Sequence, residues 1–250
     1  MRGKLERDEY ETMFHVEARH GWYLGMGEIT RKLINRWVPH PGNLRILDAG
    51  CGTGLAMTTY LAEYGAVTGF DISEDALHFC RSRKAQRLSR ASAVELPFAS
   101  ESFDLVTSFD VLYERAVSSD LAALKEFLRV LIPHGRLLLR VPAYDWLRGQ
   151  HDVIVHTARR YTAGQLKRLF RESGFTLEHL SYANTFLFPI AATKRLAEKV
   201  FPPRKTRSDL TLELGPFNKL LQTVLMWEAP LVARAGMPFG LSIFAIGRKE

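Results

Sequence analysis

The sequence contains little cysteine. Cys51 and Cys80 are the only two cysteines among its 250 residues. Small secreted domains are stabilised by several disulfides, and neither cysteine has the Cys or His spacing of a zinc site. We therefore expect a reducing, cytoplasmic compartment, no bound metal, and a core position for Cys80.

Long hydrophobic runs are also missing. No window reaches the roughly 18 apolar residues of a membrane-spanning helix, and the chain starts with charged residues rather than an apolar signal segment. Hydrophobic residues make up 46% of the sequence and charged residues 24%, as in an ordinary globular protein. This length and composition predict one large domain with an added segment.

Acidic residues are outnumbered by basic ones. The sequence has 34 Lys and Arg against 27 Asp and Glu, a formal net charge of +7. Such an excess suits a solvated helix face, a membrane surface or an acidic substrate. Nucleic acid is not expected, because no aromatic and basic platform accompanies the charge. The excess is concentrated in Lys194, Arg195, Lys199, Arg204, Lys205 and Arg207.

Three alternating glycines are the most informative feature of the chain. An apolar run ends at Asp48, and Gly50, Gly52 and Gly54 then alternate before a helix-like pattern starts. This order predicts a buried strand and a tight turn at a helix N-terminus, where glycine lets a ligand reach the main chain. Asp71 follows the next apolar stretch, and a carboxylate there can accept both hydroxyls of a ribose. The sequence therefore predicts a site for a ligand that contains a ribose.

The spacing of the glycines distinguishes between nucleotide-like ligands. A dinucleotide fingerprint needs a third glycine where Leu55 stands, and a phosphate-binding loop needs a Lys-Ser/Thr pair after its last glycine. The pattern Asp-x-Gly-x-Gly-x-Gly at residues 48–54 resembles motif I of class I S-adenosylmethionine-dependent methyltransferases, in particular the type 11-like bacterial small-molecule enzymes. The resemblance implies S-adenosyl-L-methionine as the cofactor. It also implies that the glycine loop binds the methionine end and Asp71 the ribose.

Further segments resemble the same family in the same order, over about residues 40–180. Residues 93–98 resemble its adenine-binding loop, 102–106 its fourth strand, and 128–135 the helix and turn before its fifth strand. Ser92 stands where relatives often have an aspartate, so its hydroxyl and nearby backbone N–H groups are expected to hold the adenine. The cofactor-binding residues implied by the resemblance are Asp48, Gly50, Cys51, Gly52, Gly54, Asp71, Ile72, Ser92, Ala93, Val94, Asp110 and Val111.

Apolar and polar stretches alternate as strands and helices from about residue 44 to 180. Such alternation predicts an α/β fold with a mostly parallel sheet, right-handed crossovers and helices on both faces. The resemblance implies a Rossmann-like sheet of seven strands whose last strand, near residues 239–248, is antiparallel. Ligands of such sheets bind beyond the carboxyl ends of the strands, where the predicted site residues fall. Strands are expected at 45–49, 66–71, 104–109, 135–141 and 175–182, and helices at 54–64, 73–84, 119–131 and 162–173.

Two segments lie outside a core of residues 41–182 and 238–250. Residues 1–40 are expected to form a helical cap that closes over the cofactor, as in related enzymes, or only covers the sheet edge. Residues 183–237 contain two apolar helical stretches that can serve as core, as a lid or as a lipid-facing surface. The position of this insertion favours a lid that selects a hydrophobic or amphipathic acceptor.

Methyl transfer from a sulfonium is an in-line displacement from an activated donor, so the protein mainly aligns the reactants and excludes water. A base is needed only when the acceptor must lose a proton. The polar, aromatic stretch after the fifth strand supplies the candidates: His151 and His156 as general base, and Tyr144 to position the acceptor. The alternative for each is an ordinary loop residue bonded to the backbone.

Four functions are compatible with the sequence. The leading one is S-adenosylmethionine-dependent methyl transfer to a small, hydrophobic or amphipathic acceptor. The others are a cofactor-binding module without transfer chemistry, a peripheral membrane protein that contacts lipid through residues 186–235, and a nicotinamide oxidoreductase, which Leu55 disfavours. The expected partner is a small-molecule or lipid-like substrate. The sequence defines neither the acceptor atom nor the oligomeric state.

Overall fold

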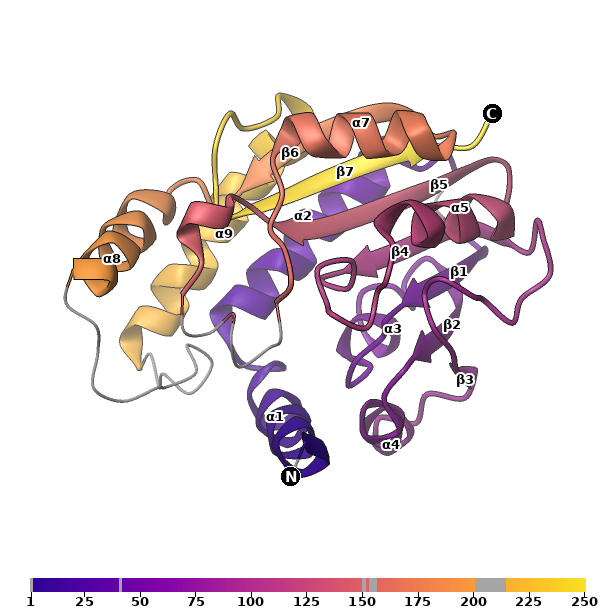
Figure 1. The fold of residues 1–250 in the computed structure, drawn as a ribbon, viewed down its shortest axis with the longest axis horizontal. Coiled ribbons are helices and arrows are strands. Elements are labelled where there is room, and N and C mark those ends of the chain that lie inside the picture. The colour runs from indigo at the N-terminus through magenta and orange to yellow at the C-terminus, as the bar shows by residue number, and fades with distance from the viewer. Residues whose placement is uncertain (1, 41, 150–151, 153–156, 201–214) are drawn as a thin grey trace.

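A seven-stranded sheet forms the centre of the protein (Figure 1). The computed structural model describes residues 2–40, 42–149, 152, 157–200 and 215–250. The strand order is β3-β2-β1-β4-β5-β7-β6. The strands are β1 (Leu44–Ala49), β2 (Gly65–Asp71), β3 (Leu88–Arg90), β4 (Phe103–Phe109), β5 (Leu131–Pro142), β6 (Thr176–Ala183) and β7 (Ser242–Arg248).

The strand directions confirm the predicted fold class. β1 pairs in parallel with β2 and with β4, and β3 and β5 extend this parallel arrangement on either side. β7 lies between β5 and β6 and runs antiparallel to both. The carboxyl ends of β1, β2, β4 and β5 therefore meet at one edge of the sheet, where a ligand site of this fold is expected.

Helices cover both faces of the sheet (Figure 1). α5 and α7 pack on one face, and α2 and α9 pack on the other. Side chains along the central strands alternate between these two layers, as the pleat of a strand requires, so that Ile46 faces α2 whereas Leu47 faces α5. The helices are α1 (Arg2–Val16), α2 (Gly21–Trp37), α3 (Leu55–Thr58), α4 (Glu74–Ser82), α5 (Asp120–Val130), α7 (Ala163–Ser173), α8 (Phe188–Val200) and α9 (Pro216–Arg234), with a 3-10 turn at Asp145–Leu147.

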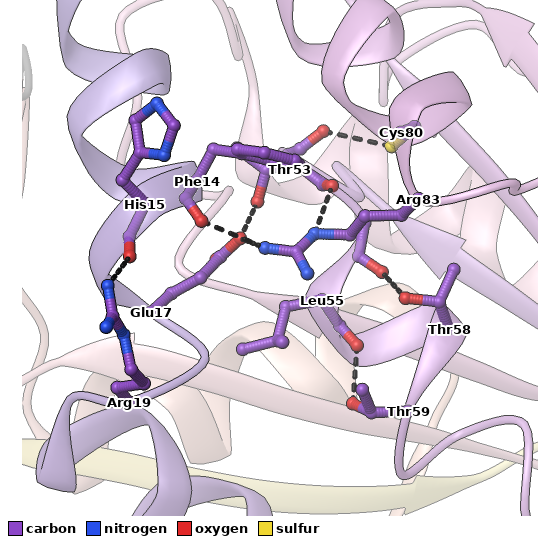
Figure 2. Close-up of polar contacts among 12 residues, drawn as sticks. Phe14, His15, Glu17, Arg19, Thr53, Leu55, Thr58, Thr59, Cys80 and Arg83 are labelled. Carbon is purple, nitrogen blue, oxygen red and sulfur yellow. Dashed lines mark hydrogen bonds and ion pairs between the residues drawn. The ribbon is translucent and has the colours of Figure 1, made fainter.

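The helix expected at residues 54–64 is much shorter than predicted, because α3 ends at Thr58. The hydroxyls of Thr58 and Thr59 donate to the carbonyl oxygens of Gly54 and Leu55 at 2.7 and 2.5 Å (Figure 2). Such side-chain bonds compete with a regular helix, and two adjacent β-branched residues weaken it further. The chain beyond α3 instead buries Leu61 against α2.

The two segments outside the core pack against each other. The backbone N–H of Gly21, at the start of α2, donates to Asn218 Oδ1 of α9 at 2.6 Å. At the other end of α2, Trp37 Nε1 donates to the carbonyl of Ala233 at 3.0 Å. A Cβ on Gly25 would lie 2.4 Å from Leu225 Cβ, so glycine permits this close approach. Helices α2 and α9 thus form one helical layer.

Candidate active site

The glycine loop has the backbone conformation that its sequence predicts. Gly50, Gly52 and Gly54 have φ values of 72°, 53° and 84°, which side chains other than glycine rarely adopt. A Cβ on Gly50 would lie 2.3 Å from Val111 Cγ2. Cys80 of α4 is buried, and its Sγ donates a hydrogen bond to the carbonyl oxygen of Gly52 at 3.1 Å. This bond connects the glycine loop to α4.

Asp71 lies at the end of β2 beside this loop and is 7% exposed. Its Oδ2 accepts the backbone N–H of Gly52 at 3.0 Å, and its Oδ1 accepts that of Ser73 at 2.9 Å. Burial raises the pKa of this carboxyl, while the backbone hydrogen bonds lower it. A carboxylate oxygen can accept two hydrogen bonds, so each oxygen retains one acceptor position for a ligand hydroxyl.

Asp48 lies at the end of β1 and is almost completely buried. Thr107 Oγ1 of the neighbouring strand donates to its Oδ1 at 2.9 Å. Burial raises the pKa of Asp48 to about 7, against the opposing effects of Thr107 and Arg140. A cationic ligand in the adjoining cavity would favour the ionised form of this carboxyl.

A cavity of about 880 Å³ opens at this edge of the sheet. Ten of the twelve predicted cofactor residues line it. The other two do not line it: Gly54 is the residue directly before α3, and Val94 packs against the hydrophobic core. The described residues hold no cluster of ligands suited to a metal ion. The ten lining residues are Asp48, Gly50, Cys51, Gly52, Asp71, Ile72, Ser92, Ala93, Asp110 and Val111.

The structure describes only one of the three predicted catalytic residues, Tyr144. His151 and His156 lie outside the described residues. Tyr144 stacks on Tyr182, with ring centroids 5.3 Å apart, and is not among the side chains that line the cavity. Asp152 and Thr157, which are adjacent in sequence to the two histidines, do line the cavity.

An ion pair of Asp152 holds in place the stretch that follows β5. It is 3% exposed, and Arg160 donates to both of its carboxylate oxygens at 2.8 and 3.1 Å. The pKa of Asp152 is lowered because the hydrogen bonds and charge of Arg160 outweigh its burial. Arg160 also donates to the carbonyl of Ala143 at 3.0 Å, which fastens the stretch to the end of β5.

An ion pair between β4 and β5 was not predicted. Arg140 donates from Nε and Nη2 to Asp110 Oδ2 at 2.9 and 2.6 Å, and its guanidinium lies over the ring of Trp22 at 5.0 Å. Both partners line the cavity, and Asp110 has a φ of 60°. The sequence does contain a signal, since Arg140 interrupts the apolar run of residues 137–141 and a buried charge requires a partner.

A second unpredicted cluster joins the N-terminal cap to the glycine loop (Figure 2). Glu17, which follows α1, is 3% exposed and accepts hydrogen bonds from Thr53 Oγ1 and from Arg83 Nη2. Arg83 also donates to the carbonyls of Thr53 and Phe14 at 3.1 and 3.2 Å, and its guanidinium lies 4.5 Å from the centre of the Phe14 ring. Burial raises the pKa of Glu17, although both hydrogen bonds lower it. These contacts hold α1 beside the loop.

Aromatic residues and the insertion complete the cavity. Tyr23 of α2, Tyr60 and Tyr113 line it, and burial raises the pKa of each phenol. Segments far apart in the sequence therefore line the same cavity. The insertion contributes Leu187, Ala191, Lys194, Arg195 and Leu221.

The glycine turn, the carboxylate of Asp71 and the cavity at the carboxyl ends of the strands lie where the resemblance to S-adenosylmethionine-dependent methyltransferases implies a cofactor site. A family model described as "Methyltransferase domain" matches residues 47–139. For residues 47–139 this match supports the predicted family and its cofactor, S-adenosylmethionine.

Two curated relatives match part of the chain. The demethylmenaquinone methyltransferase of Staphylococcus aureus (strain MRSA252) is 36% identical over 118 residues, covering 44% of this chain and 48% of that protein. The malonyl-[acyl-carrier protein] O-methyltransferase of Erwinia pyrifoliae is 40% identical over 115 residues, covering 44% of this chain and 43% of that protein. The chain thus matches less than half the length of either relative.

The similarity of fold extends over nearly the whole chain. An S-adenosylmethionine-dependent methyltransferase from Thermotoga maritima superimposes with a TM-score of 0.61 at 19% identity, covering 97% of this chain and 95% of that one. The flanking helical segments are therefore part of an architecture that occurs in another methyltransferase. In the part of the chain that the structure describes, no helix has the length and apolar character to cross a membrane.

Proposed function

We propose that this protein transfers a methyl group from S-adenosylmethionine to a small, hydrophobic or amphipathic acceptor. The observation that carries the proposal is the single cavity of about 880 Å³ shared by both predicted ligands. The ribose carboxylate Asp71 lies in its wall together with Leu187 and Leu221 of the insertion. One cavity would therefore hold a donor site and an apolar acceptor site, as a direct displacement requires.

The residues present fit the cofactor. Asp71 retains one acceptor position on each oxygen for the two ribose hydroxyls. Gly50 and Gly52 of the glycine loop line the cavity, and we place the methionine end beside them. Ser92 and Ala93 line the cavity next to the end of β3, where we place the adenine. The cofactor supplies an activated methyl group on a cationic sulfonium.

The charges around this end of the cavity support a cationic donor. Asp48, Asp71 and Glu17 all line it, and each has a pKa raised by burial. Buried carboxyls of this kind are stabilised in their ionised form by a nearby positive charge. A sulfonium and an ammonium group would provide that charge.

The acceptor side combines apolar and basic side chains. Leu147, Leu187 and Leu221 line the cavity together with Lys194 and Arg195. This combination suits an acceptor with an apolar body and a polar or acidic group. The two curated relatives are named for different acceptors, demethylmenaquinone and malonyl-[acyl-carrier protein], so kinship alone does not select one.

For an acceptor that must lose a proton, we propose His156 as the general base, with His151 as the second candidate. The support is that Thr157 and Asp152, their neighbours in sequence, both line the cavity. A His156→Ala variant is expected to lose turnover while keeping its affinity for the cofactor.

The proposal is tested by supplying methyl-labelled S-adenosylmethionine and the protein to a cell extract divided into an organic and an aqueous phase. Transfer of label to a compound in the organic phase, absent with an Asp71→Ala variant, is the expected result. Cofactor binding without transfer to any compound would support the alternative of a binding module. Contact of residues 186–235 with a membrane would add to the proposed chemistry rather than replace it.

A further inference from the structure

The outer face of α9 is apolar and uncovered. Phe217, Leu220, Trp227 and Leu231 are 68%, 57%, 75% and 43% exposed. Successive residues of a helix are separated by about 100°, so these four side chains and the half-exposed Val224 fall within an arc of about 80°. The spacing places five large apolar residues in one stripe along the helix.

Exposed apolar residues also occur in α8 and at Phe186, just before it, which we count with α8. Phe186, Ile190 and Leu196 are 52%, 72% and 54% exposed. The start of α8 is fixed to α9, because the buried carboxylate of Glu228 accepts the backbone N–H of Thr185 at 3.0 and 3.1 Å. Both helices lie at the same end of the molecule (Figure 1). We call these exposed residues of α8 and α9 together the apolar end face.

The charge around the apolar end face is positive. The exposed charged residues of α9 are Lys219 and Arg234, whereas Glu228, the one acid of that helix, is buried. Among the described residues 186–200 and 215–235, five are Lys or Arg and two are Glu. An anionic surface complements this charge, whereas a second copy of the same face would repel it.

We propose that the apolar end face docks on the surface of an anionic lipid bilayer. Exposed Trp and Phe side chains favour the boundary between headgroups and acyl chains, and basic flanks add attraction to acidic headgroups. Such a helix lies in the plane of the interface and does not cross the membrane. The protein then binds a membrane reversibly through α8 and α9.

Docking would also orient the cavity. Leu187, directly before α8, Ala191 of α8 and Leu221 of α9 line the cavity, so the same two helices contribute to its wall. The bilayer would therefore lie against the outer side of the wall that we assign to the acceptor, and an amphipathic acceptor could pass between membrane and site. The passage of an acceptor rests on the proposed function, whereas the docking itself does not.

The test is co-sedimentation of the full chain with vesicles of phosphatidylcholine alone or mixed with phosphatidylglycerol, without cofactor. The unmodified protein is expected to bind the mixed vesicles, and binding should weaken as salt is raised because the Debye length shortens. The double variant Leu220→Ser/Trp227→Ser should bind about tenfold less tightly or worse, since two large apolar groups no longer enter the interface.

Met226→Ser is the matched control, because Met226 is 47% exposed on the same helix but points about 100° away from Trp227. It should bind vesicles like the unmodified protein. Thermal unfolding and calorimetric titration with S-adenosylmethionine show whether each variant is folded. As a measurement without a destabilising change, Trp fluorescence should shift to shorter wavelength with mixed vesicles, and a Trp227→Phe variant should lose most of that shift.

Three results would overturn the proposal: no binding of the unmodified protein to mixed vesicles, equal binding to both vesicle types, or unchanged binding of the folded double variant. If the protein does not bind vesicles but forms a dimer that the double variant converts to a monomer, the face would be assigned to a second copy. Because no turnover is measured, failure here leaves methyl transfer untouched. Conversely, vesicle binding by a protein without transfer activity would leave docking intact.

Discussion

The guanidinium of Arg83, directly after α4, donates to the carboxylate of Glu17, directly after α1, at 2.7 Å. Thr53 of the glycine loop donates to the same carboxylate oxygen (Figure 2). Because Glu17 is buried, its charge depends on the partly buried guanidinium of Arg83 for its stability. The N-terminal helix α1 is therefore coupled directly to the glycine loop.

Replacing Glu17 with Gln should loosen this coupling. The variant removes the anionic partner of Arg83, and we expect the free energy of unfolding to fall by about 1–3 kcal/mol. The dissociation of S-adenosylmethionine should also become faster, since α1 is released more easily. Stopped-flow displacement and denaturant unfolding measure the two effects. Glu11→Gln, an exposed change on the same helix, should alter neither. An unchanged dissociation rate in Glu17→Gln would show that α1 does not retain the cofactor.

Asp71→Ala should weaken binding of S-adenosylmethionine by about 1–3 kcal/mol, because hydrogen bonds from the ribose hydroxyls to a charged group are lost. The backbone N–H groups of Gly52 and Ser73 lose their acceptor as well, so the loop itself becomes less ordered. Calorimetric titration gives the affinity. Glu172→Ala on the surface of α7 is the control and should bind normally. Equal affinities for both variants would remove Asp71 from the ribose site.

The buried Asp48 predicts a pH-dependent stability in the absence of cofactor. Its pKa of about 7 in the folded protein is well above that of an aspartate in an unfolded chain, about 4. Below pH 4 the group is protonated in both states. Between pH 4 and about 7 the unfolded chain releases the proton first, so the free energy of unfolding falls, and the fall levels off above that range.

The size of this fall should approach about 4 kcal/mol, at about 1.4 kcal/mol for each pKa unit. Asp48→Asn has no such proton to release, so its unfolding curve should be flatter by that amount between pH 4 and 8. Urea unfolding of both proteins across this range measures the difference. Curves that run parallel would mean that Asp48 is ionised in the folded protein throughout.

Gly54→Ala should lower the free energy of unfolding by about 1–3 kcal/mol. Gly54 has a φ of 84°, and a Cβ there would lie 2.9 Å from Cys80 Sγ, so the new methyl group adds both backbone strain and overpacking. Gly164→Ala is the control, because a Cβ on Gly164, in the first turn of α7, meets nothing within 4 Å. The control should be neutral or slightly stabilising in thermal unfolding. Similar losses in both variants would contradict the strained role of Gly54.

The sequence predicted the parts of this protein that are encoded locally. The strand before Asp48, the alternating glycines and the carboxylate of Asp71 each depend on a short pattern whose physical requirement is fixed by the turn and the ligand. The same pattern overestimated the helix after Gly54, because hydrogen bonds from Thr58 and Thr59 to the backbone compete with it.

The contacts that were missed join residues far apart in the chain. Glu17 and Arg83 are 66 positions apart, and each is an ordinary charged residue of an amphipathic helix in sequence. Nothing local distinguishes them from solvated side chains. Arg140 is the exception, because a charge inside the apolar run of β5 indicates a buried partner without identifying Asp110.

The packing of α2 against α9 has a consequence for synthesis on the ribosome. Gly21 and Asn218, which join these helices, are 197 positions apart, so the partner of α2 leaves the ribosome only when most of the chain has been made. Until then the apolar side of α2 has no α9 to cover it, and an exposed surface of this kind favours aggregation and recognition by chaperones. Nascent chains that stop before residue 216 would carry the complete glycine loop but lack the helix that holds α2 in place.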